Sequence, residues 1–173
     1  IVAALVGARS AYYALLGPRL ILDDWLVTYR GRFSGLAHSV PEVTRIAQPT
    51  KWLWLTGIFA LADERPLVLF ALVTLVNLAA ALALYYAVNR FFPAPVPLLV
   101  AGLWVLTANH SSLTVWAAAS QAVVSVACCC LGITLLSKGR WLAALVAFSA
   151  STLAYEFTIP ICFVASVLVG GPW

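Results

Sequence analysis

Two adjacent carboxylates, Asp23 and Asp24, follow directly on the apolar stretch that opens the chain, and Trp25 comes next. Neighbouring carboxylates disfavour double ionisation, and a nonpolar surrounding favours the protonated form further. Such a pair suits a general base or a ligand for a divalent cation at a membrane surface. A solvated helix cap is the alternative interpretation. The functional interpretation therefore depends on the position of the pair, between an apolar run and a long polar segment.

Two further charged residues stand out because apolar sequence surrounds them. Arg9 interrupts the first apolar run, and Glu156 stands alone between two later ones. An ionisable side chain inside a membrane span is costly and is treated first as a functional hypothesis. The alternative for Arg9 is that its side chain reaches a membrane interface. Glu156 is expected either near the outer surface or paired with Arg9 or His110 across the bundle.

The composition places these residues in a membrane protein. Of the 173 residues, 64% are hydrophobic and 9% are charged, whereas a soluble domain is about 25% charged. A soluble fold could not bury so much apolar surface, so we predict a polytopic α-helical protein in a lipid bilayer. The net charge of +4 is scattered and forms no basic stripe, which leaves nucleic-acid binding without support.

The apolar runs predict an all-α bundle of transmembrane helices. The run that begins at Pro66, a residue typical of helix starts, is the clearest, because about 20 residues cross a bilayer. Asn77 lies in its middle and is expected to hydrogen-bond to a neighbouring helix. Three of the later runs are nearer 14 to 16 residues. The expected spans are about 1–20, 66–89, 95–108, 113–137, 141–154 and 157–171.

Residues 21–65 form the longest polar segment and are expected to be one long loop. Within it, residues 51–62 are mostly apolar and begin with two Trp residues. This stretch is too short to cross the bilayer as a helix, and Trp favours the membrane interface. We predict an interfacial helix here. A short true span is the rival interpretation, and it would reverse the side of every later loop.

The charges of the loops predict which face of the membrane carries the Asp pair. With residues 51–62 at the interface, the loops at Arg90 and at Lys138 and Arg140 share one side and contain no acid. Short basic loops are typical of the cytoplasmic side. The six basic residues from Arg19 to Arg65 argue the other way, and we give them less weight. The long first loop is therefore predicted to be extracytoplasmic, in a multi-pass protein of the plasma or inner membrane.

The four cysteines all lie within apolar runs. Adjacent cysteines rarely satisfy disulfide geometry, and neither a Cys-x-x-Cys motif nor a Cys/His spacing for zinc occurs. We expect them to be small packing residues. They are Cys128, Cys129, Cys130 and Cys162.

The order of these features resembles the GT-C superfamily of glycosyltransferases, which use polyprenyl-phosphate sugars. In that family an acidic motif follows the first span, and a long extracytoplasmic loop with surface helices leads through a Pro-containing stretch into the second span. The stretches of this chain that carry the resemblance are Asp23-Asp24, Arg45 with Gln48-Pro49, Arg65-Pro66, and Tyr85 to Arg90. Since the chain has no Met and opens inside an apolar run, we expect an N-terminal fragment of a longer protein.

Two later stretches resemble the protein O-mannosyltransferase-like branch of that superfamily. His110 to Trp116 is similar to its His-x-Glu-x-Val-x-Trp pattern, with Ser112 and Thr114 in place of the Glu and the Val. The segment that ends at Glu156 is similar to its Ser-Lys-Glu pattern with a following Pro. These departures leave the branch, and therefore the acceptor, open.

The resemblance implies a transfer of sugar with inversion, in which Asp23 or Asp24 acts as base or helps to hold a divalent cation. The departing polyprenyl phosphate needs cations or hydrogen-bond donors at the membrane edge. The expected substrate-binding residues are Arg45, Lys51, Arg65, His110 and Glu156. The absence of nucleotide-binding motifs favours a lipid-linked donor.

A different class of function stays open beside this one. A transporter or channel segment would use Arg9 and Glu156 to line a pathway through the membrane. The sequence names neither the sugar nor the acceptor.

Overall fold

The computed structural model describes residues 1–15, 46–63, 65–107 and 117–170. Within these ranges the chain is helical and contains no strand, as the composition predicts. The α-helices of the described part are α1 (Val2–Leu15), α5 (Pro49–Ala62), α6 (Pro66–Val88), α7 (Val96–Leu106), α9 (Gln121–Leu136), α10 (Trp141–Ala154) and α11 (Ile159–Gly170). Two short 3-10 helices, η1 (Ala117–Ala119) and η2 (Glu156–Thr158), precede α9 and α11.

One helix of the described part, α6, is long and apolar enough to cross a membrane. It has 23 residues and a mean hydropathy of 2.6 in its most apolar window, which corresponds to about 35 Å of helix. The described parts of the other five predicted spans contain helices of 11 residues in α7 to 16 in α9, and none of these described helices is long enough to be counted as a span by itself. The fourth differs most from the prediction, since α9 begins at Gln121 and not near 113.

The helix start predicted at Pro66 is confirmed, and Pro49 begins a helix as well. Pro49 and Pro66 occupy the first turns of α5 and α6, where the missing amide hydrogen costs nothing. Between the two helices, Asp63 adopts a left-handed conformation and its amide donates to Phe59 O. Asp63 therefore ends α5 three residues before α6 begins at Pro66.

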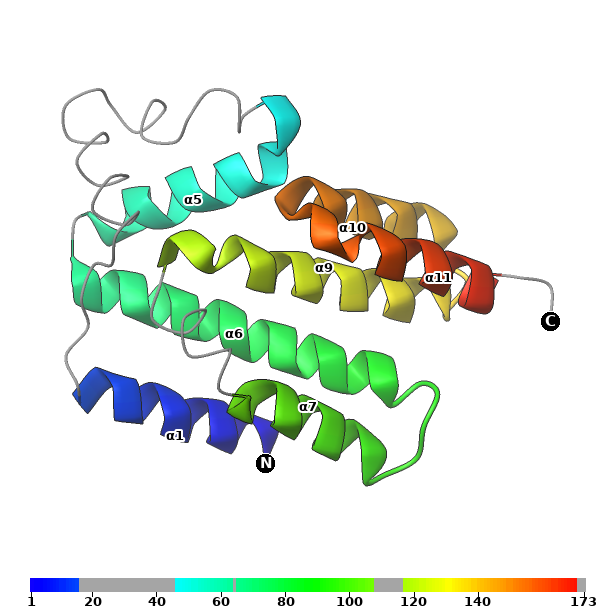
Figure 1. Ribbon diagram of the computed structural model, residues 1–173, viewed down its shortest axis with the longest axis horizontal. Coiled ribbons are helices and arrows are strands. Elements are labelled where there is room, and N and C mark those ends of the chain that lie inside the picture. Colours follow the sequence, from blue (N-terminus) through cyan, green and yellow to red (C-terminus); the bar gives the residue numbers. More distant parts are fainter. Residues whose placement is uncertain (16–45, 64, 108–116, 171–173) are drawn as a thin grey trace.

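The helix α6 lies in the middle of the bundle (Figure 1). The helices α1 and α7 pack on one side of it, and α9 packs on the other, followed by α10 and α11. Several contact positions are alanines with almost no exposed surface, including Ala80, Ala81 and Ala101. Small residues allow the close backbone approach that is typical of helices packed in lipid.

Buried hydroxyl groups join α9, α10 and η2. The Ser125 hydroxyl lies 2.8 Å from Ser151 O, and the Ser151 hydroxyl lies 2.7 Å from Ser125 O, each donating to the other's carbonyl. The Thr158 hydroxyl lies 3.0 Å and 2.9 Å from those two hydroxyls. Because all three side chains are fully buried, these bonds satisfy groups that would otherwise cost free energy. They hold the start of α11 against the start of α9.

The helix directions create two distinct ends of the bundle. The N-terminal half of α1 packs near Ala81, and Ser10 lines a small cavity with Asn77, so α1 runs antiparallel to α6. At the end that we call the loop end, α1, α7 and α10 finish, and α6, α9 and α11 begin. At the opposite end, called the turn end, residues 89–95 join α6 to α7 and residues 137–140 join α9 to α10.

Candidate functional site

The structure describes three of the predicted site residues, and all three lie at the loop end. Lys51 is in the first turn of α5, Arg65 is the N-cap residue of α6, and Glu156 begins η2. The remaining predictions lie outside the described residues. They are Asp23, Asp24, Arg45 and His110.

Glu156 links two segments that are far apart in the sequence. The Gln48 side-chain amide donates to Glu156 Oε2 at 2.5 Å, across 108 residues of chain. Gln48 is the N-cap residue of α5, so this bond attaches the start of α5 to the start of η2. Glu156 is exposed, which agrees with the predicted position near a surface. The predicted alternative of an ion pair with Arg9 is wrong, since Arg9 bonds elsewhere.

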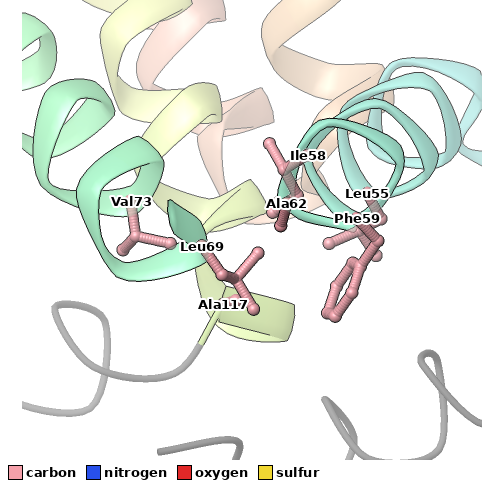
Figure 2. Packing of buried hydrophobic residues seen from close by; sticks show 7 residues of the cluster. All are labelled: Leu55, Ile58, Phe59, Ala62, Leu69, Val73 and Ala117. Carbon is pink, nitrogen blue, oxygen red and sulfur yellow. The ribbon is translucent and has the colours of Figure 1, made fainter. Parts of the chain in front are cut away.

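The helix predicted for residues 51–62 is confirmed as α5 (Pro49–Ala62), and it packs on the bundle through large apolar side chains. Figure 2 shows Leu55, Ile58 and Phe59 of α5 facing Leu69 and Val73 of α6. These five side chains are buried. Removal of their apolar surface from water is the main stabilising term for such a contact. The α5 helix is therefore docked against α6.

A second bond attaches α5 to the start of α9. The Trp54 indole donates to the Ser120 hydroxyl at 2.7 Å, and that hydroxyl donates in turn to Ala117 O at 2.6 Å. Buried Trp residues usually find such a partner for the indole N–H. The two bonds at Gln48 and Trp54 thus hold α5 over the loop end at two points.

The Arg65 guanidinium is accessible at this end. It lies 3.9 Å from the Asp63 carboxylate, and the two side chains are 73% and 80% exposed. An exposed ion pair of this length contributes at most about 1 kcal/mol. Arg65 can therefore exchange Asp63 for an anionic group of a ligand at little cost.

Three buried polar atoms lack a hydrogen-bond partner within the described part of the chain. They are Trp52 Nε1 of α5, Thr74 Oγ1 of α6 and Gln121 Oε1 of α9. Buried polar groups are normally satisfied by protein, water or a bound molecule. The helices α5, α6 and α9, which carry these three atoms, pack against one another. Unpaired polar atoms are therefore found on three helices that are in mutual contact.

Arg9 lies in a separate polar contact between α1, α6 and α7. Its guanidinium donates to Val105 O and lies 5.9 Å from the centre of the Tyr13 ring. A cavity of about 10 Å³ adjoins Arg9, Ser10 and Asn77, which is room for about one water molecule. The Asn77 amide donates to Val73 O of its own helix at 2.9 Å. Arg9 thus connects α1 to α7 through a backbone carbonyl.

The predicted packing role of the cysteines agrees with the structure. All four are free thiols, and Cys129, Cys130 and Cys162 are buried. Cys129 and Cys162 lie 3.6 Å apart at sulfur, between α9 and α11. Among the described residues no group of three His, Cys, Asp or Glu side chains could hold a metal ion. The carboxylates predicted as cation ligands, Asp23 and Asp24, are outside that part.

Sequence reasoning missed the residues that dock α5. Gln48 was noted only as part of a family-like stretch, and Trp54 and Ser120 were not singled out. The Pro at position 49 could have pointed to Gln48, because the residue before a helix-starting Pro is the N-cap. Nothing local in the sequence points to Ser120.

Comparisons of the chain with models of protein families, with curated proteins and with solved structures found no match.

Proposed function

We propose that this chain belongs to an integral-membrane glycosyltransferase of the GT-C type. It would transfer a sugar from a polyprenyl-phosphate donor to an acceptor on the extracytoplasmic face of the membrane. The loop end of the bundle would be the active end.

Large apolar side chains on the outer surface support the membrane part of this proposal. Leu75, Leu103, Val146 and Phe163, from four different helices, are each more than 60% exposed. In water such a surface would favour association, whereas in lipid it is the normal exterior of a helix bundle. The shorter helices would cross together with α6, and flanking residues would complete their length.

The catalytic part of the proposal is supported by the helix ends that meet at one end of the bundle. Residues 16–45 lie in sequence between α1 and α5, and residues 108–116 lie between α7 and η1; by the helix directions, α1 and α7 finish at the loop end and α9 begins there. We therefore take the loop end, where Lys51, Arg65 and Glu156 lie, as the active end. Residues brought to one end can act on one substrate.

The reaction follows from the chemistry of these residue types. The acceptor oxygen attacks the anomeric carbon of the sugar, and the bond from that carbon to the phosphate oxygen breaks. Asp23 or Asp24 accepts the proton of the acceptor hydroxyl. Lys51 and Arg65 stand at opposite ends of α5, about 20 Å apart, so one of the two stabilises the negative charge of the departing polyprenyl phosphate. The bond between Gln48 and Glu156 positions α5, which carries Lys51, over that site.

Substitution of the two carboxylates tests the proposal directly. Asp23→Asn and Asp24→Asn, made singly in the full protein, are assayed for transfer of radiolabelled sugar from polyprenyl-phosphate donors. We expect one of them to lose about 10²- to 10⁴-fold in rate, the usual contribution of a general base. Asp63→Asn is the matched control, because Asp63 is an exposed turn residue. Full activity in both test variants would refute the assigned site.

A transporter or channel segment is the second candidate, and the polar contact around Arg9 favours it. A pathway through the bundle would have to pass Arg9, Ser10 and Asn77, which line one cavity. Glu156 bonds to Gln48 at the loop end and would stand only at the entrance. Solute flux in proteoliposomes without any sugar donor, abolished by Arg9→Gln, would support this candidate over the transferase.

A further inference from the structure

An apolar groove runs along the side of the bundle between α9, α11 and the turn that follows α6. It consists of two neighbouring hollows of about 610 Å³ and about 230 Å³. Phe91, Ile133 and Ile161 line both of them. Pockets for small molecules typically measure about 300–1,000 Å³. The groove is therefore large enough for a hydrocarbon chain, and its walls are almost entirely apolar side chains.

Cations stand at the turn end of this groove. Arg90 directly precedes Phe91, which lines the groove. Lys138 follows Ile133 by five residues and lies in the turn just past the end of α9. Arg140 lies in the same turn, and all three cationic side chains are exposed. The turns that follow α6 and α9, next in sequence to segments that line the groove, thus carry exposed cations.

The described acids are found at the other end of the bundle. Both acids in the part that the structure describes, Asp63 and Glu156, lie at the loop end. No described carboxylate therefore neutralises the cations of the turn end. A ligand that matches this face has an apolar chain and an anionic head group.

We propose that the groove binds one acyl chain of an anionic glycerophospholipid, whose phosphate is held by Arg90, Lys138 and Arg140. Lys and Arg near a membrane surface attract anionic head groups, and both residue types are standard phosphate ligands. The bound lipid would fill the space between α9 and α11 at the end opposite to the proposed catalytic residues. The inference rests on membrane embedding and not on glycosyl transfer.

Native mass spectrometry of the full protein in detergent tests the head-group preference. The protein is mixed with phosphatidylglycerol or phosphatidylcholine of identical acyl chains, and the retained adducts are counted. We expect preferential retention of phosphatidylglycerol. Removal of each cation should weaken the preference for phosphatidylglycerol about fivefold. Arg90→Ala combined with Lys138→Ala should therefore reduce that preference about 10- to 30-fold.

A second pair of variants tests the groove without touching any charge. Val164 lines the larger hollow and is 51% exposed, whereas Val146 is 70% exposed on α10 outside it. Val164→Trp fills the groove and should reduce retention of both lipids, while Val146→Trp should leave retention unchanged. Since both side chains are largely exposed, neither variant disturbs the core of the bundle.

Equal retention of the two lipids by the unmodified protein would overturn the proposal. So would an undiminished preference in the double variant, or lipid retention that Val164→Trp leaves intact. A dimer peak that Val164→Trp abolishes and Val146→Trp keeps would assign the groove to a second copy of the chain instead. Because no measurement here needs sugar transfer, loss of activity in the Asp23 and Asp24 variants bears only on the proposed function.

Discussion

Two helix contacts of this protein are stabilised by different kinds of residues. At the α9–α10 contact, a Cβ placed on Gly132 would lie 2.5 Å from two carbons of the Phe148 ring, and serines exchange hydrogen bonds with backbone carbonyls. At the contact of α5 with α6, large apolar side chains such as Ile58 and Leu69 fill the space. One contact depends on close backbone approach, and the other depends on buried apolar area.

The difference indicates which contact can open separately. Small-residue packing and interhelical hydroxyl bonds remain effective in lipid, where no hydrophobic driving force acts between helices. Burial of large apolar side chains stabilises a contact mainly where water is the alternative. The α5 contact should therefore lie where water reaches it, at the loop end. We expect α5 to detach without unfolding the α9–α10 pair.

The largest effect is expected for Ile58→Ala. Ile58 is 2% exposed in the α5 contact, and truncation of a buried Ile costs about 2–5 kcal/mol. Hydrogen exchange in α5 should accelerate while exchange in α9 and α10 stays slow. Leu61→Ala is the control on the same helix, because Leu61 is 70% exposed. If exchange rises equally in all the helices, α5 is part of one cooperative unit and the comparison fails.

A smaller effect is expected for Gly132→Ala. The added methyl group must displace the buried Phe148 ring, and overpacking of this kind costs about 1–3 kcal/mol. The thermal unfolding temperature in detergent should fall, and exchange should rise in α9 and α10. Gly57→Ala is the matched control, since a Cβ at Gly57 meets nothing within 4 Å. Equal behaviour of the two variants would show that the close approach does not limit stability.

The smallest effect is expected for the bond between Gln48 and Glu156. Glu156→Leu removes the acceptor and should cost about 0.5–1.5 kcal/mol at this exposed position. Glu156→Gln keeps a side-chain oxygen for the Gln48 amide and should cost less. Hydrogen exchange at residues 48–52 reports the difference. Identical protection in the two variants would mean that this bond does not hold the start of α5.

Much of the fold could be predicted from local sequence. Pro66 set the start of α6 and residues 51–62 were assigned to a short helix, because prolines and apolar runs act on their immediate neighbours. The candidate site was predicted less completely. Glu156 was identified as unusual, but its partner Gln48 is 108 residues away, and no spacing rule connects them.

The sequence by itself determined that the chain is helical, strongly apolar and punctuated by short turns, since hydropathy and Pro and Gly positions are local properties. Only the tertiary structure decided which helix faces meet. The helices are apolar on every side, so no amphipathic stripe marks the buried face. The faces that meet are set by steric fit at positions such as Gly132 and Phe148, and by the pairing of polar groups that are distant in sequence.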